Sequence, residues 1–298
     1  MLVLAVNAGT ASPARAAAAT CVSPRRPADS VTAAGAALRK SIERIVAGAP
    51  SGRWSVYIRD LRSGETVSVG GDVVVHPAST IKVGIAVDMM AWLEAHPEAK
   101  RTNGPPGQTR SFEQLLAAML VKSEEGATAT LTNFLNSQPG FAANRQLHGW
   151  GAACSTVVPR RATAADLALL LKRLYDGELL SPASTDLLLS LMRTPSADDN
   201  LRLGGGLPLT ARLRLAHKTG TLFQGGLGVV ADVGVVTLPR GAFVIAAIGN
   251  QTEWADFDES MALIGEMARA AYAALGPGER ACPERAPLRA PEPDLRPC

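Results

Sequence analysis

The chain has 298 residues, enough for one large domain or two interleaved lobes, and its 47% hydrophobic and 19% charged content is that of a globular protein. A net charge of +3 with scattered basic residues argues against a nucleic-acid partner. No run of 18 apolar residues occurs, so no stable membrane span is expected.

Residues 1–30 resemble the remnant of a secretory signal peptide followed by a linker. An apolar start precedes Ala14-Arg15-Ala16, which is similar to a signal-peptidase cleavage site; a disordered Ala-rich start is the alternative. We therefore expect a secreted or periplasmic protein.

Four cysteines in an exported chain predict two disulfides with three possible pairings. Pairing of Cys21 with Cys282 or Cys298 would join the chain ends, and Cys154 could instead carry a free thiol.

Hydrophobic spacing predicts the elements in chain order. A helix over 32–47 precedes strands over 53–59 and 66–69, and another helix starts near Ser79. In the middle of the chain we expect helices over 111–121, 127–135, 163–175 and 181–192. Strands over 214–218, 229–238 and 242–249 follow, then a helix over 258–275.

This order predicts an α+β fold with an antiparallel sheet flanked by helices. Segments 31–100 and 196–275 would form one discontinuous α/β domain, and 101–195 an inserted all-helical domain. Residues 276–298 are rich in Pro and Arg and read as an exposed tail.

The stretch from His76 to Lys82 suggests chemistry, because it places Ser79 and Lys82 on the first turn of a helix. Residues three apart share a helix face, so the Lys82 amine can lie beside the Ser79 hydroxyl. The N–H groups and positive dipole end of that helix point at whatever lies over Ser79. A hydroxyl with a neighbouring base and oxyanion donors is the minimum equipment for acyl transfer.

Two more motifs follow in order: Ser123-Glu124-Glu125, and Lys218-Thr219-Gly220-Thr221 at a predicted strand end. With Ser79-Thr80-Ile81-Lys82, the chain resembles the penicillin-recognising serine enzymes and looks most like a divergent class A β-lactamase. The resemblance covers roughly residues 30–275. It implies a β-lactamase/transpeptidase-like fold, a monomer, a β-lactam or cell-wall peptide as partner, and neither a metal nor a cofactor.

The resemblance also implies a role for each motif residue. Ser79 would be the nucleophile, Lys82 its base and Ser123 the group that passes a proton to the leaving nitrogen. Lys218 would hold Ser123 and attract a substrate carboxylate. The substrate-binding residues would be Glu125, Thr219, Gly220 and Thr221, with the N–H groups of Ser79 and Thr221 forming the oxyanion hole.

Glu125 departs from the family, where the second motif reads Ser-Asp-Asn. A carboxylate here could pair with Lys82, raise the lysine pKa and weaken it as a base. Glu125 could instead be the base itself, or a surface carboxylate that points away.

A second departure concerns release of the acyl group. Class A β-lactamases carry a glutamate in a loop that activates the deacylating water, but residues 136–163 contain no Asp or Glu. His148 and Gln146 are the only substitutes with suitable chemistry, and His148 reads as an ordinary loop histidine. Leu227 also stands where the family often has an arginine that anchors a carboxylate.

The sequence thus favours a secreted serine hydrolase that is acylated at Ser79 and deacylates slowly. A cell-wall D,D-carboxypeptidase is one alternative. A non-catalytic binding protein that keeps the fold is the other.

Overall fold

The computed structural model describes residues 20–21, 32–139, 143–194 and 201–276. Two predicted segments lie outside the described residues except at single points: the signal remnant and linker, of which residues 20–21 are described, and the C-terminal tail, of which residue 276 is described. Cys282 and Cys298 lie outside them as well. None of the helices in the described ranges is long and apolar enough to cross a membrane.

One antiparallel sheet with the strand order β2-β1-β5-β4-β3 forms the centre of the fold. Its strands are β1 (Arg53–Asp60), β2 (Thr66–Val69), β3 (Leu215–Gln224), β4 (Leu227–Leu238) and β5 (Gly241–Glu253). β1 pairs with β5 from Arg53↔Asn250 to Asp60↔Phe243, so the two ends of the chain share one sheet. The predicted antiparallel sheet built from both ends is confirmed.

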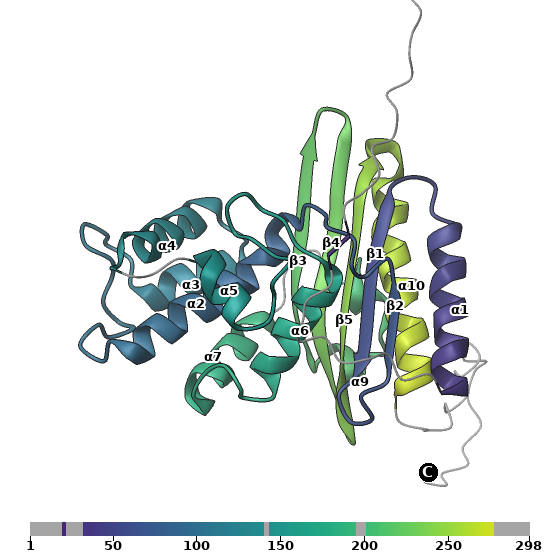
Figure 1. Ribbon diagram of the computed structural model, residues 1–298, viewed down its shortest axis with the longest axis horizontal. Helices are drawn as coiled ribbons and strands as arrows, with labels where there is room; N and C mark the ends of the chain where they lie inside the picture. The colour runs from purple at the N-terminus through teal and green to yellow at the C-terminus, as the bar shows by residue number, and fades with distance from the viewer. Residues whose placement is uncertain (1–19, 22–31, 140–142, 195–200, 277–298) are drawn as a thin grey trace, which may run out of the picture.

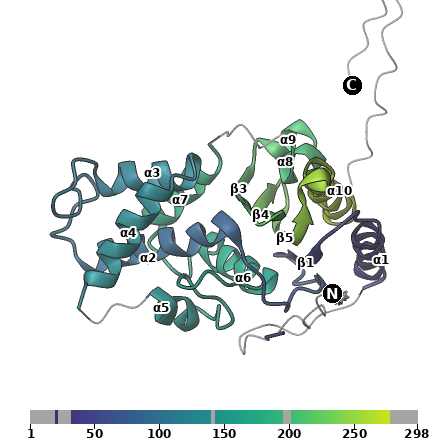
Figure 2. The same ribbon diagram turned by 90° about the horizontal axis from the view of Figure 1, so that it is seen from above.

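Helices cover both faces of this sheet (Figure 1). They are α1 (Ala33–Ala47), η1 (Ala78–Ile81), α2 (Lys82–Ala95), α3 (Phe112–Val121), α4 (Glu125–Ser137), α5 (Ala143–Gly149), α6 (Ala164–Tyr175), α7 (Pro182–Met192), α8 (Leu203–Gly206), α9 (Leu209–Arg212), η2 (Trp254–Asp256) and α10 (Phe257–Leu275). α1 and α10 pack on one face, while α6 and the group α2–α5 and α7 lie on the other (Figure 2).

Alternating strand residues supply a core on each face, as expected for a sheet with both faces covered. Val56 and Ile58 of β1 join the core under α1 and α10, whereas Tyr57 joins the core under α6. The helix starts follow their capping residues: Ser111 closes a capping box with Gln114, and Thr163 accepts the Asp166 N–H at 3.1 Å.

β3 is longer than its predicted span of 214–218. It continues to Gln224 and joins β4 through Gly225 and Gly226, both with positive φ (63° and 84°). Two such residues suit a two-residue hairpin turn, for which Gly-Gly is a favoured sequence. The Lys218-Thr219-Gly220-Thr221 motif therefore lies inside an edge strand and not at a strand end.

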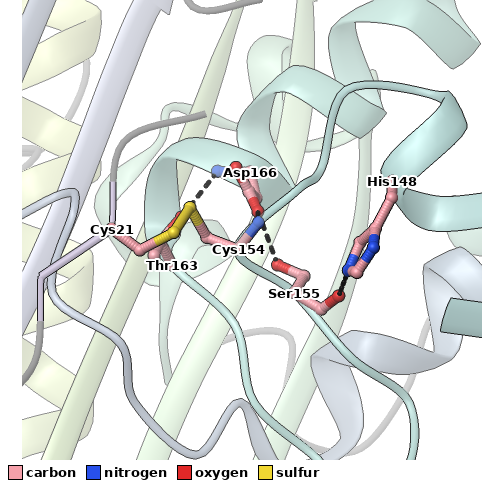
Figure 3. The surroundings of a disulfide bond; sticks show 6 residues. All are labelled: Cys21, His148, Cys154, Ser155, Thr163 and Asp166. Carbon is pink, nitrogen blue, oxygen red and sulfur yellow. Dashed lines mark hydrogen bonds between the residues drawn. A yellow bond between two sulfur atoms is a disulfide. The ribbon is translucent and has the colours of Figure 1, made fainter. Parts of the chain in front are cut away.

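The sequence leaves the partner of Cys21 open, and in the structure that partner is Cys154 and not a C-terminal cysteine. Cys21 forms a disulfide with Cys154, 133 residues away (Figure 3). The Cys21 N–H also donates to Asp72 O at 2.9 Å, in the segment between β2 and η1, while the disulfide joins Cys21 to the loop that precedes α6. Cys154 is therefore not the free thiol that was the other possibility.

Candidate active site

Ser79 lies in a tight turn of 3₁₀ helix between the chain entering from β2 and helix α2. Ala78 adopts φ 49°, a left-handed conformation unusual outside glycine. The His76 ring Nδ1 accepts the Ala78 N–H at 3.0 Å, and Thr80 Oγ1 donates to Pro77 O at 2.6 Å. Such strained turns persist only where neighbouring contacts hold them, and they cluster at functional sites. Ser79 is 7% exposed, and its hydroxyl has no hydrogen-bond partner in the described ranges.

The Lys82 amine is completely buried at the start of α2. Nζ donates to Ser123 O at 2.8 Å, Ser123 Oγ at 3.2 Å and Glu125 Oε1 at 2.7 Å. These contacts use all three N–H groups of an ammonium, so the amine faces Ser123 and Glu125 and not the Ser79 hydroxyl.

The corner between α3 and α4 presents Ser123, which has φ 54°. Glu124 pairs with Arg110 through two bonds, of 2.8 and 3.0 Å, and its carbonyl accepts the Thr128 hydroxyl at 2.8 Å. Fork-shaped pairs of this kind fix geometry as well as charge. They hold Ser123 where its hydroxyl meets Lys82.

Glu125 faces the site and does not point away from it, although its side chain is 61% exposed. Besides Lys82 it binds Arg160, with Oε2 2.7 Å from Nη2 and Oε1 3.4 Å from Nη1. Partial burial alone would raise the pKa of Glu125, but the hydrogen bonds and charges of Arg160 and Lys82 outweigh it and bring the pKa to about 2. The carboxylate is thus ionised at neutral pH and bridges two cations.

Burial is the main influence on the pKa of Lys82, the partner of Glu125 in this ion pair. It lowers the pKa of Lys82, and the charge of Arg160 lowers it further, while Glu125 opposes both. Burial and then Arg160 also lower the pKa of His76, which stays an acceptor for the Ala78 N–H. The site is therefore arranged around one buried lysine with charges of both signs beside it.

Strand β3 packs directly against the Ser79 turn at Gly220. A Cβ at this position would lie 3.0 Å from Pro77 O and 3.1 Å from Ser79 N, so any side chain would push β3 and the turn slightly apart. Lys218 is 3% exposed and donates to Thr219 O at 2.9 Å. The structure thus brings the three predicted motifs together around Ser79.

An arginine that the sequence did not reveal lies behind this strand. Arg202 is 1% exposed, and its Nη2 donates to Thr221 Oγ1 at 2.6 Å, while Nη1 donates to Gly220 O and Ala231 O. It comes from the start of α8 and not from the beginning of β4, where Leu227 stands. No local pattern marks it, because its place depends on how α8 folds back on the sheet.

The loop before α6 supplies no carboxylate to the site. His148 Nε2 contacts Ser155 O at 3.1 Å, and Gln146 lines a separate pocket with Trp92 and Trp150. Asp166 accepts Cys154 N at 2.7 Å and Ser155 Oγ at 3.0 Å beside the disulfide (Figure 3). Burial raises its pKa to about 6. These groups stabilise the loop, and the side chain that the loop sends to the site is Arg160.

No group of three or more His, Cys, Asp or Glu side chains in the described ranges could hold a metal ion. The arrangement has the parts that nucleophilic chemistry needs: a hydroxyl on a rigid turn, a buried amine, a second hydroxyl and an edge strand for a ligand to lie along.

Comparison with known proteins agrees with this arrangement. A model of the β-lactamase enzyme family matches residues 37–97 and 98–275. The β-lactamase VEB-1 of Pseudomonas aeruginosa is 30% identical over 179 residues, which are 53% of this chain and 58% of that protein. The match thus spans less than two thirds of the length of that relative.

Solved structures share the fold. PBP-A is 27% identical, with a TM-score of 0.69 over 83% of this chain and 98% of that chain. A PBP-A mutant in an acyl-enzyme complex with penicillin G is 27% identical, with a TM-score of 0.67 over 80% and 96% of the two chains. The TLA-1 extended-spectrum β-lactamase, at 21% identity, has a TM-score of 0.69 over 81% and 99%. The likeness covers both the sheet and the helices beside it, which confirms the fold class that the motifs implied.

Proposed function

The chain belongs to the β-lactamase enzyme family, and we propose that it is a serine hydrolase whose Ser79 is acylated by β-lactams or D-Ala-D-Ala-type peptides and released slowly. The observation that carries the proposal is the buried Lys82 amine. The amine binds Ser123 and Glu125, and its residue follows Ser79 by three positions at the start of α2, while the edge strand β3 packs onto the Ser79 turn at Gly220.

In the acylation step, Ser79 Oγ attacks the carbonyl carbon of the amide and a neutral Lys82 takes the hydroxyl proton. The C–N bond then breaks, Ser123 passes a proton to the leaving nitrogen, and an ester to Ser79 remains. The oxyanion would accept from the N–H groups of Ser79 and Thr221. Lys218 and Arg202 add positive charge along β3 for a substrate carboxylate, with the hydroxyls of Thr219 and Thr221 beside them.

Deacylation requires a base to take a proton from the attacking water as the ester bond breaks and Ser79 regains its hydroxyl. The loop before α6 contributes Arg160 instead of a carboxylate. Glu125 is the carboxylate in contact with Lys82, but with a pKa of about 2 it is a weak base at neutral pH. This supports an acyl-enzyme that accumulates.

Two further observations support the proposal. PBP-A, which shares the fold at 27% identity, forms an acyl-enzyme with penicillin G in a mutant form. The Cys21–Cys154 disulfide fits an oxidising compartment, in line with a secreted or periplasmic protein.

Intact-protein mass spectrometry after incubation with penicillin G tests the proposal. We expect a mass increase of one penicillin per chain that persists for many minutes and is absent in Ser79→Ala. No adduct from any of several penicillins and cephalosporins would contradict it and favour a non-catalytic binding protein.

A cell-wall D,D-carboxypeptidase is the second candidate, because the same hydroxyl, buried amine and edge strand could act on a peptide amide. It predicts release of D-alanine from a pentapeptide analogue, measured by a coupled assay, with Ser79→Ala as the inactive control.

A further inference from the structure

The Glu125 carboxylate binds two cations, one fully buried and one partly exposed. Glu125 Oε1 lies 2.7 Å from the fully buried Nζ of Lys82, and Oε2 lies 2.7 Å from the Arg160 guanidinium, whose side chain is 28% exposed. Arg160 reaches Glu125 from the loop before α6, 35 residues later in the chain. Nothing in the spacing of the three motifs accounts for this arginine.

The charges explain why the pair matters. In the motif that this chain resembles, a neutral amide occupies the position of Glu125. A lone carboxylate there would favour the protonated form of Lys82, which cannot take a proton from Ser79. Glu125 and Arg160 together carry no net charge, so the pair is an electrostatic substitute for the neutral side chain.

We propose that Arg160 is a positioning residue: it neutralises Glu125 and thereby lets Lys82 act as the base for Ser79. This inference rests on the proposed function for its catalytic meaning. Its electrostatic part, the effect of Arg160 on Lys82, concerns the protein without substrate and is tested separately.

The direction of each effect on Lys82 agrees with this role. Burial lowers its pKa most, Glu125 raises it, and Arg160 lowers it again. Other titratable groups near the site are His76 beside the Ser79 turn, Lys218 on β3 and the Arg110–Glu124 pair at the α3–α4 corner. Of these His76 titrates nearest neutral pH in its ordinary range, so the test has to separate it from Lys82.

The experiment measures the pH dependence of Ser79 acylation by penicillin G in the wild type and three variants. In Arg160→Gln, Glu125 is unopposed, so Lys82 keeps its proton to higher pH. We expect the acid limb of the acylation rate to move up by about one pH unit and the rate at pH 7 to fall about tenfold, since a unit of pKa corresponds to a factor of ten. In Glu125→Gln the acid limb of the acylation rate should move to lower pH, because the Arg160 charge then acts on Lys82 alone. The double variant should return toward the wild type.

Two controls sharpen the result. Arg160→Lys keeps the charge and should keep the wild-type limb, whereas a purely structural role of the guanidinium fork would not be rescued by lysine. His76→Asn retains an acceptor for the Ala78 N–H; if the shift caused by Arg160→Gln disappears in this background, the limb belongs to His76 and the inference is wrong.

Titration of Lys82 by NMR on lysine-labelled protein, assigned with Lys82→Arg, gives a readout without any substrate. A Lys82 pKa that rises in Arg160→Gln supports the inference, and an unchanged one overturns it. Absence of acylation in the wild type would overturn the proposed function instead, and the NMR titration would still decide the effect of Arg160.

Discussion

At the scale of single residues, the site depends on contacts that tolerate little change. Ala78, which precedes Ser79, and Ser123 both have left-handed backbone conformations. The Lys82 amine donates all three of its N–H groups to Ser123 and Glu125. Rates in such a site are sensitive to displacements of about 1 Å.

Gly220→Ala should damage both activity and stability. Its Cβ would lie 3.0 Å from Pro77 O and Thr80 Cγ2 and 3.1 Å from Ser79 N, so β3 or the turn must move. We expect a loss of about 1–3 kcal/mol in the free energy of unfolding and a fall of about 100-fold in acylation. Gly149→Ala, where a Cβ meets nothing within 4 Å, is the matched control. Wild-type acylation in Gly220→Ala would contradict the close approach of β3 to Ser79.

Asp88→Asn should stabilise the protein at neutral and alkaline pH. Asp88 is fully buried on α2, and neither carboxyl oxygen has a hydrogen-bond partner in the described ranges. Burial raises its pKa well above the usual value. In the unfolded chain the Asp88 carboxyl ionises from about pH 4. The free energy of unfolding of the wild type therefore falls by up to about 1.4 kcal/mol per pH unit above that, until the buried carboxyl also ionises.

The measurement is the melting temperature of wild type and Asp88→Asn between pH 4 and pH 8. The melting temperature of Asp88→Asn should rise relative to that of the wild type as the pH rises. Asp186→Asn, at an exposed position on α7, is the control and should show no such change. A difference that is constant with pH would show that Asp88 does not carry this burial cost.

At the scale of elements, the loop before α6 connects the Cys21–Cys154 disulfide to the site. Its beginning is held by the Cys21–Cys154 disulfide and Asp166, and its end by backbone bonds between Ala162 and Val75. Between these two anchors it presents Arg160 to Glu125. The loop is thus fixed at both ends, as a positioning role for Arg160 requires.

Removing the disulfide should destabilise the protein. The two cysteines close a loop of 133 residues, and a cross-link of this kind typically contributes about 2–4 kcal/mol, mainly by constraining the unfolded chain. We expect Cys21→Ser/Cys154→Ser to melt at lower temperature than the wild type and to be insensitive to dithiothreitol. A wild type whose melting temperature is unaffected by full reduction would contradict this.

At the scale of the whole molecule, the sheet separates two cores, and the site lies at its β3 edge where η1, α2 and the α3–α4 corner meet. The antiparallel topology and the order of the three motifs could be predicted from the sequence, because strand alternation, capping residues and S-x-x-K spacing are local signals. The full length of β3 was missed, although Gly225-Gly226 is itself a hairpin signal.

Other features depend on distant contacts that no local pattern marks. Arg160 and Arg202 reach the site from loops, and the partner of Cys21 is decided by the approach of the N-terminal segment to the loop before α6. Glu125 could be picked out as unusual, but its orientation depends on Arg160, so its alternative roles stayed open. The division into a sheet domain and an inserted helical domain stays a prediction.

The proposed function requires that acylation of Ser79 is fast relative to deacylation. Stopped-flow mixing with a chromogenic cephalosporin tests it most directly, because ring opening reports acylation. We predict a burst of about one equivalent per chain, absent in Ser79→Ala, followed by turnover at least about tenfold slower. Linear turnover without a burst would contradict slow deacylation, and no colour change at all would contradict acylation itself.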